Sequence, residues 1–266
     1  MEHGNPPGAA DREERIRPAC AVWHRNADFA TAAADLAAQL QLPLAAPGAP
    51  PAGYRLLVGP ALMLQDDRPG SPGGIVAALA QAADQGERYR QAGAGREALL
   101  RAVGARRGHR PHVVDATAGL GRDALVMAAA GCRVTMIEHC PLLAAMLAHS
   151  LATPAPQLRQ VAARMRLLCG DALHLLSTPG DVDVIYLDPM YDTPGRRAKP
   201  GKEMQLLQGL LGADPDPAPL LAAALACDTC RVVVKRHRKA PAMADMAPHH
   251  SITGRSTRFD VYLPSR

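Results

Sequence analysis

Four acidic residues stand where apolar runs of the chain give way to turns. Asp115 follows His-Val-Val, Glu138 follows Val-Thr-Met-Ile, Asp171 follows Leu-Leu-Cys-Gly, and Asp188 follows Val-Ile-Tyr-Leu. Carboxylates accept hydrogen bonds from hydroxyl and amine groups. Apolar runs of this length are typical of buried strands. The spacing therefore predicts a polar ligand held where several strands end.

The segment after Asp115 is a glycine turn, in the sequence VVDATAGLGRDAL (113–125). Gly119 and Gly121 let the backbone approach a ligand and adopt positive φ, and the helix that follows offers free N–H groups. A dinucleotide fingerprint has its first glycine directly after the strand and a third glycine where this chain has Ala124. The GK[ST] of a phosphate-binding loop is absent too. The turn therefore predicts a site for a polar or anionic ligand outside these two classes.

The surrounding elements alternate between strands and helices. Strands are expected at 112–116, 132–138, 165–169, 181–191, 231–236 and 258–264, with helices at 97–105, 121–131, 141–152, 174–177, 202–212 and 217–227. This order predicts an α/β fold with a doubly wound, mostly parallel sheet. Ligands bind such sheets at the carboxyl ends of the strands. The last two strands lack a long helix between them, so one is expected to be antiparallel.

The rest of the chain predicts a smaller part. Residues 1–18 are expected to be disordered, and residues 19–75 to form a small α+β unit with a hairpin at 54–67 split by Gly59-Pro60. A helix is expected to begin near Ile75. Residues 76–266 then form the large domain.

The tetrapeptide Asp188-Pro189-Met190-Tyr191 ends the most apolar strand. An exocyclic amine on a nucleobase is a poor nucleophile, because its lone pair is delocalised into the ring. The Asp188 carboxylate and the Pro189 carbonyl can accept its N–H bonds, and Tyr191 can stack on the base at about 1–3 kcal/mol. Catalysis of this kind depends on positioning and electrostatics. These three residues are the expected catalytic group.

The glycine turn resembles the first motif of class I S-adenosylmethionine (SAM)-dependent methyltransferases, and DPMY resembles their (D/N/S)PP(Y/F) motif. Together with KEMQLLQ, RVVVKR and RFDVY, these segments resemble the bacterial RsmJ family, which methylates guanine N2 in small-subunit (16S) ribosomal RNA. The resemblance covers most of residues 70–266 and implies a Rossmann-like class I methyltransferase fold. The cofactor residues implied are Asp115, Gly119, Gly121, Arg122, Asp123, Glu138, His139, Asp171, Ala172 and Asp188. His139 stands where the family is expected to have arginine, and Asp171-Ala172 replaces a small hydroxyl pair.

The net charge of +5 permits an anionic partner. Basic residues concentrate in three patches, at 96–110, at 196–202 after DPMY, and at 235–239. The patch at 96–110 is equally well explained as a solvated face. The residues expected to bind RNA phosphates are Arg196, Arg197, Lys199, Lys202, Lys235, Arg236 and Arg258.

Several classes of protein are disfavoured. No apolar run is long enough to span a membrane and the N-terminus lacks the features of a leader, so a cytoplasmic protein is expected. Cys227 and Cys230 have no second pair to complete a zinc site, so no metal is expected. Cys132, Cys140 and Cys169 are expected to be small core residues. No obligatory protein partner is indicated. The alternatives are an enzyme of the same fold that methylates DNA adenine or protein, and a silent RNA-binding module.

Overall fold

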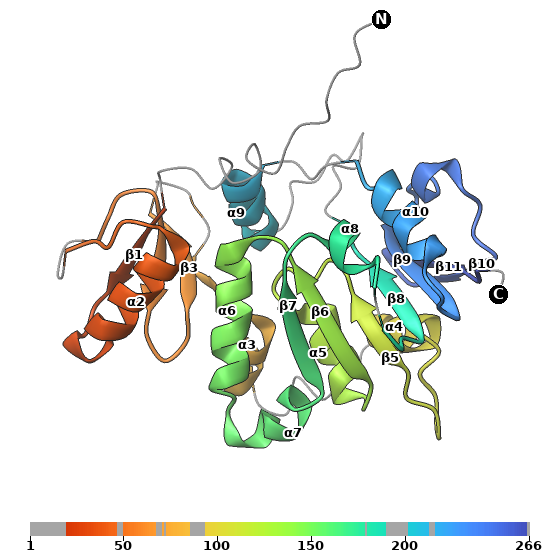
Figure 1. Cartoon of the computed structure of the whole chain (residues 1–266), viewed down its shortest axis with the longest axis horizontal. Coiled ribbons are helices and arrows are strands. Elements are labelled where there is room, and N and C mark those ends of the chain that lie inside the picture. Colours follow the sequence, from red (N-terminus) through yellow and green to blue (C-terminus); the bar gives the residue numbers. More distant parts are fainter. Residues whose placement is uncertain are drawn as a thin grey trace, which may run out of the picture. The chain divides into compact units, whose positions relative to one another are not determined.

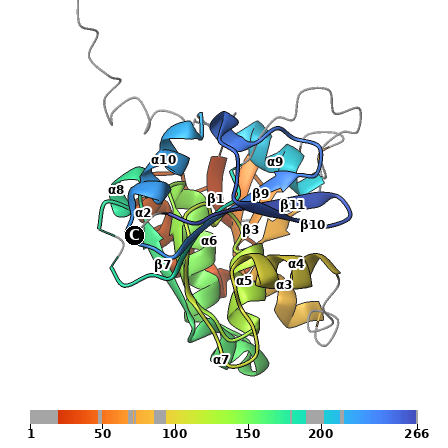
Figure 2. The same cartoon turned by 90° about the vertical axis from the view of Figure 1, so that its right-hand side faces the viewer.

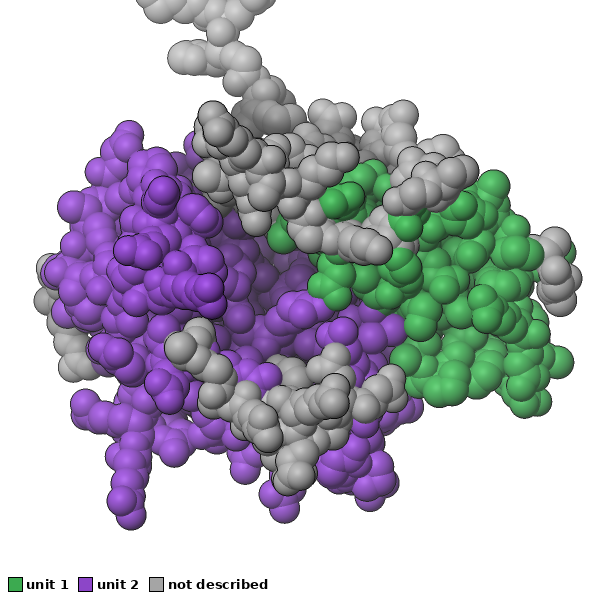
Figure 3. Space-filling model, turned by 180° about the vertical axis from the view of Figure 1, so that it is seen from behind, with its two compact units in different colours: residues 1–75, 196–213 green, residues 76–195, 214–266 purple. Residues whose placement is uncertain are grey.

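The computed structural model describes residues 20–46, 50–67, 71, 73–85, 94–178, 180–189, 202–212 and 216–264. The chain divides into two compact units. Unit 1 comprises residues 1–75 and 196–213, and unit 2 comprises residues 76–195 and 214–266 (Figure 3). None of the helices in the described ranges is both long and apolar enough to cross a bilayer.

Unit 1 contains a four-stranded sheet in the order β1-β2-β3-β4. Its elements are β1 (Cys20–His24), α2 (Ala30–Leu40), β2 (Tyr54–Val58), β3 (Met63–Asp66), β4 (Ile75–Val76) and α9 (Lys202–Leu211). β2 and β3 are antiparallel neighbours, which confirms the predicted hairpin. The prediction of a helix from Ile75 was wrong by three residues, because Ile75 and Val76 form a short strand and the helix begins at Ala78.

Unit 2 is built on a seven-stranded sheet in the order β10-β11-β9-β8-β5-β6-β7 (Figure 1). Its strands are β5 (His112–Asp115), β6 (Arg133–Glu138), β7 (Met165–Cys169), β8 (Val184–Leu187), β9 (Arg231–His237), β10 (His250–Thr253) and β11 (Thr257–Tyr262). The five strands from β7 to β9 are parallel. β11 is antiparallel to both β9 and β10, which confirms the expected change of direction near the C-terminus.

Helices cover both faces of this sheet (Figure 2). They are α3 (Ala78–Gln85), α4 (Ala94–Ala102), α5 (Arg122–Ala129), α6 (Pro141–Ala152), α7 (Arg159–Ala162), α8 (Ala172–Leu175) and α10 (Ala218–Ala226). α5, α6, α3 and α4 pack together on one side. On the other side, α10 buries Leu221 and Ala224 against Ile185, Val232 and Val234. β8 is apolar and buried from Val184 to Leu187, and β9 from Val232 to Val234, as expected when both faces of a parallel sheet are covered.

The doubly wound arrangement brings the carboxyl ends of β5, β6, β7 and β8 to one edge of the sheet. β5 lies between β6 and β8, which follow it in the chain on opposite sides. This is the switch point at which open α/β sheets bind ligands. The fold predicted from sequence is therefore confirmed at the edge where the acidic residues lie.

Candidate active site

The glycine turn connects the end of β5 to the start of α5. Gly119 and Gly121 both have left-handed backbones, with φ of 55° and 75°. A Cβ on Gly121 would lie 2.9 Å from Leu147 Cδ2, whereas a Cβ on Gly119 would have no atom within 4 Å. Gly121 is therefore required for close packing of the turn onto α6, and Gly119 lies beside open space into which a ligand can come close to the backbone.

Glu138 ties the end of β6 to this turn. Its Oε2 accepts a hydrogen bond from the Gly119 N–H at 2.7 Å, and its Oε1 accepts one from the Cys140 N–H at 2.8 Å. The side chain is buried, and the exposed His139 places Nδ1 3.5 Å from Oε1. An ionised carboxylate has about four acceptor positions. Glu138 can therefore shape the turn and still accept hydrogen bonds from a ligand's hydroxyls.

Asp171 lies after β7 and begins α8. Its Oδ1 accepts the Leu173 N–H at 2.9 Å, so it is the N-cap of this one-turn helix, in which Ala172 is the first residue. Cys169, the last residue of β7, is exposed. The expectation that Cys169 is a core residue was wrong, because the strand leaves the buried part of the sheet before it ends. Cys132 and Cys140 are buried, as expected.

Asp188 is held directly beside the glycine turn. Its backbone N–H donates to Thr117 Oγ1 at 2.6 Å, and its Oδ2 accepts from Lys235 Nζ at 2.7 Å. The same ammonium donates to Asp123 Oδ2 at 2.8 Å. Pro189 follows at the described end of the segment. The start of α5 and the ends of β5, β8 and β9 thus form one polar group.

Two further members of this group are buried. The Tyr186 hydroxyl donates to Asp123 Oδ2 at 2.5 Å, and burial with the charges of Asp123 and Asp188 raises the pKa of Tyr186. Burial raises the pKa of Asp115 to about 8; Asp123 and Asp188 add to the shift, while the Thr117 N–H and Lys235 oppose it. Asp115 is thus protonated at neutral pH. No pattern in the sequence points to Tyr186, because its partner Asp123 is 63 residues away.

The described residues expected to bind RNA have different surroundings. The Lys235 ammonium is turned toward the carboxylates of Asp123 and Asp188. Arg258 forms an ion pair with Asp260, in which Nε lies 2.7 Å from Oδ1 and Nη2 lies 2.8 Å from Oδ2. Arg236 Nη2 donates to the Pro241 carbonyl at 3.1 Å. Lys202 is the first residue of α9 in unit 1. Tyr191, Arg196, Arg197 and Lys199 lie outside the described residues.

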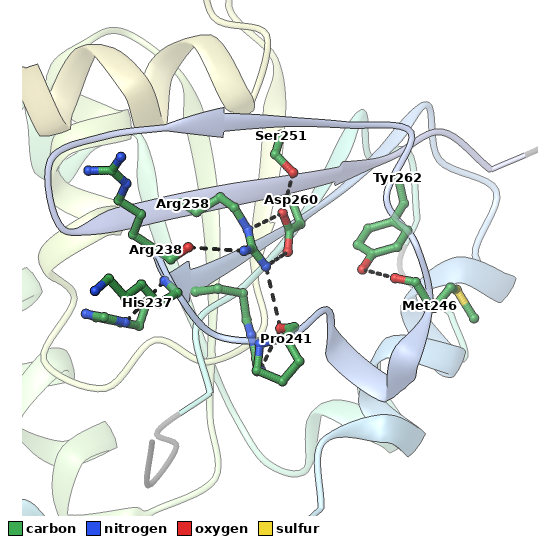
Figure 4. A network of polar contacts seen from close by, with 10 residues as sticks. His237, Arg238, Pro241, Met246, Ser251, Arg258, Asp260 and Tyr262 are labelled. Carbon is green, nitrogen blue, oxygen red and sulfur yellow. Dashed lines mark hydrogen bonds and ion pairs between the residues drawn. The ribbon is translucent and has the colours of Figure 1, made fainter. Parts of the chain in front are cut away.

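Arg258 holds the loop that follows β9, residues 238–241. Figure 4 shows its guanidinium between the Asp260 carboxylate and the carbonyl oxygens of Arg238 and Pro241. Asp260 is fully buried and also accepts from Ser251 Oγ at 2.6 Å. This network fixes the shape of the 238–241 loop, in which Arg238 and Lys239 are exposed.

The comparisons with known proteins agree with this architecture. Residues 37–264 match the family model of a putative SAM-dependent methyltransferase. A SAM-dependent methyltransferase from Neisseria gonorrhoeae is 33% identical in sequence, with a TM-score of 0.68 over 91% of this chain and 95% of that one. The fold and the site therefore define a class I SAM-dependent methyltransferase.

The sequence relatives narrow the class. The ribosomal RNA small subunit methyltransferase J of Pseudomonas paraeruginosa is 42% identical over 250 residues, which is 92% of this chain and 95% of the relative. That of Alkalilimnicola ehrlichii is 44% identical over 88% of this chain and 92% of the relative. The chain belongs to the ribosomal RNA small subunit methyltransferase J family.

The residues present fit SAM. The cofactor carries two ribose hydroxyls and two positive charges, on its ammonium and its sulfonium. Glu138 lies at the end of β6, Asp115, Asp123 and Asp188 lie around the end of β5, and the space beside Gly119 is open. Carboxylates suit both the hydroxyls and the cations.

Proposed function

We propose that the protein transfers a methyl group from SAM to the exocyclic N2 amine of a guanosine in small-subunit ribosomal RNA. The observation that carries the proposal is the 42% identity over 92% of the chain to a ribosomal RNA small subunit methyltransferase J. The placement of Asp188 beside the glycine turn supports it. A ribosomal substrate would place the protein in the cytoplasm.

The proposed cofactor contacts follow the edge of the sheet. Gly119 and Gly121 shape the turn, with Asp115 below it, and Arg122 and Asp123 begin the helix after it. Glu138 accepts ribose hydroxyls, with His139 beside it. Asp171 and Ala172 flank the adenine of the cofactor, and Asp188 lies between the cofactor and the substrate. This assignment uses the carboxyl ends of four neighbouring strands, β7, β6, β5 and β8.

Bound SAM supplies a methyl group already activated by the sulfonium. The protein must orient a poor nucleophile, and the Asp188 carboxylate and the Pro189 carbonyl would accept the two N–H bonds of the amine. When N2 takes the methyl group, with S-adenosylhomocysteine as the leaving group, Asp188 would accept one N2 proton and pass it on to solvent. Tyr191 would stack on the base. Holding the two reactants in this geometry is the main source of rate.

The RNA is proposed to bind beyond this site, through phosphate contacts. The 238–241 loop supports this assignment, because Arg258 fixes it and Arg238 and Lys239 are exposed on it. In this assignment Arg258 and Arg236 shape the RNA-binding surface, while Arg238 and Lys239 touch the phosphates. Arg196, Arg197, Lys199 and Lys202 remain proposed phosphate contacts of the segment after DPMY.

The test is methyl transfer from labelled SAM to small-subunit RNA and to assembled subunits, both lacking the modification. Digestion to nucleosides should place the label in N2-methylguanosine, and Asp188→Ala should abolish it while weakening SAM binding only moderately. Label in another nucleoside would keep the chemistry and contradict the substrate. Label on DNA adenine or protein alone would favour the alternatives of the same fold. SAM binding without any transfer would favour a silent RNA-binding module.

A further inference from the structure

We infer that Lys235 is a positioning residue for methyl transfer, which orients the Asp188 carboxylate and keeps it anionic, and that it makes no contact with an RNA phosphate. The inference rests on the proposed function of Asp188 as the acceptor for the target amine.

The strand register places Lys235 beside Asp188. β9 is the parallel neighbour of β8, with Val234 opposite Leu187, so the next residues of both strands are adjacent at the carboxyl edge. The Lys235 ammonium is 2.7 Å from Asp188 Oδ2 and 2.8 Å from Asp123 Oδ2. Charge-assisted hydrogen bonds at these distances are among the stronger polar contacts in proteins. One ammonium thus bridges the proposed acceptor of the amine and a proposed cofactor residue.

Asp123 gives this bridge a fixed end. Its Oδ2 accepts both Lys235 Nζ and the hydroxyl of Tyr186, a residue with no exposed surface. Lys235 is therefore held between an anchored carboxylate and Asp188. The backbone of Asp188 is itself bonded to Thr117, so both its main chain and its side chain are restrained. Restraint of this kind is what a reaction that depends on geometry requires.

The charge balance gives Lys235 a second effect. Among the described residues, the titratable groups facing it are Asp115, Asp123, Tyr186 and Asp188, which are three acids and a phenol. Burial alone would lower the pKa of the Lys235 ammonium, but Asp188 and Asp123 raise it, so Lys235 stays charged. Without this cation the acids would repel one another and hold protons to higher pH. A protonated Asp188 would lose its ability to take the amine proton.

The same geometry argues against a phosphate contact. The side chain of Lys235 is only 28% exposed, and its charge is already shared by two carboxylates. A phosphate brought to this ammonium would be repelled by the negative charge that Asp123 and Asp188 carry beyond the single positive charge of Lys235. Lys239, four residues further on and exposed, is free of that obstacle.

The experiment compares Lys235→Met and Lys235→Arg with Lys239→Met and Arg159→Met in the labelled-SAM assay on small-subunit RNA. Arg159 is an exposed cation on α7, before the amino end of β7, and controls for loss of one positive charge. For Lys235→Met, kcat should fall roughly 100-fold with the RNA KM within about threefold, and the acid limb of the kcat profile should move to higher pH. Lys235→Arg should keep the wild-type acid limb and recover part of kcat. Lys239→Met should raise the RNA KM and reduce its salt dependence.

The outcomes separate this inference from the proposed function. Wild-type protein that leaves the RNA unlabelled would contradict the proposed function itself. Labelled RNA with a normal kcat and a raised, less salt-dependent KM in Lys235→Met would overturn the positioning role. If Lys235→Met fails to fold, Lys235→Arg decides: a shifted acid limb in a variant that keeps the charge would overturn the electrostatic argument.

Discussion

Replacing Asp115 by asparagine should change how the stability of the ligand-free protein depends on pH. The Asp115 side chain ends β5 and is only 2% exposed. Burial raises its pKa to about 8, and the neighbouring charges of Asp123 and Asp188 add to the shift. Asparagine has nearly the same shape, and its amide oxygen can still accept the Thr117 N–H that Asp115 Oδ1 accepts at 3.2 Å. The substitution therefore removes the titration with little change in packing.

The sign follows from the two states of the carboxyl group. In the unfolded chain its pKa is about 3.8, whereas in the native protein it is about 8. Between these values the native state holds a proton that the unfolded state has released. The contribution of Asp115 to stability is thus fully present below about pH 4 and is lost as pH rises through 8. In the middle of this window the loss is roughly 1 kcal/mol for each pH unit.

The assay is urea unfolding of wild type and Asp115→Asn at pH 5.5, 6.5 and 7.5. The free energy of unfolding of the wild type should fall relative to the variant by roughly 1 kcal/mol per pH unit. Asp228→Asn is the matched control, because Asp228 is exposed and its variant should run parallel to the wild type. Parallel curves for Asp115→Asn as well would show that Asp115 is ionised in the native protein, which would refute the argument from burial.

The same titration should appear in cofactor binding. A ligand with a positive charge near Asp115 favours the ionised carboxyl, so binding should release a proton near neutral pH. Calorimetry of SAM binding in two buffers with different ionisation enthalpies measures that proton. The Asp115→Asn protein should release fewer protons than the wild type. Equal proton release from both proteins would show that the positive charges of SAM do not change the protonation of Asp115.

Two further predictions concern packing at the site and near it. Gly121→Ala should cost about 1–2 kcal/mol and lower Tm, because its backbone is left-handed and its Cβ would lie 2.9 Å from Leu147 Cδ2. Gly119→Ala shares the left-handed backbone but meets no such neighbour, so Tm should fall less and calorimetry should show weaker SAM binding. Arg258→Met should lower the free energy of unfolding in urea by about 3–5 kcal/mol, because it leaves the fully buried Asp260 without its cation. The double variant Arg258→Met with Asp260→Asn should recover part of this loss. Equal losses in the single and the double variant would contradict the ion-pair explanation.

Much of the fold was predictable from sequence because strand and helix periods alternate clearly in unit 2. The segments at 112–115 and 184–187 have apolar runs that are too short for helices, and both segments are bounded by turns. Other elements gave weaker signals. β10 carries three exposed polar residues and only one large apolar one, so nothing in HSIT marks a strand until β11 pairs with it. Chain order likewise gives no sign that α9 groups with the first 75 residues.

The acidic residues of the site could be found because each ends a strand or begins a helix, and those positions converge at one edge of any doubly wound sheet. Their contacts could not be found in the same way. Glu138 was expected to face a ribose, and its two oxygens also hold the N–H groups of Gly119 and Cys140. A single sequence shows which residue types reach the edge and leaves open which of them shape the loops there.

The basic residues show most clearly what cannot be predicted from the sequence alone. KRHRK is one run in the sequence, and the sequence predicts one phosphate-binding patch there. In the structure its first lysine meets Asp123, 112 residues away, and Asp188, 47 residues away, while Arg238 and Lys239 are exposed. A strand sends alternate side chains to opposite faces, and a residue near its end can reach a side chain just beyond the end of the neighbouring strand. The function of a cation is therefore set by the nearest carboxylate in space, so neutralising Lys235 and neutralising Lys239 should affect different kinetic constants although the two lie in one basic run.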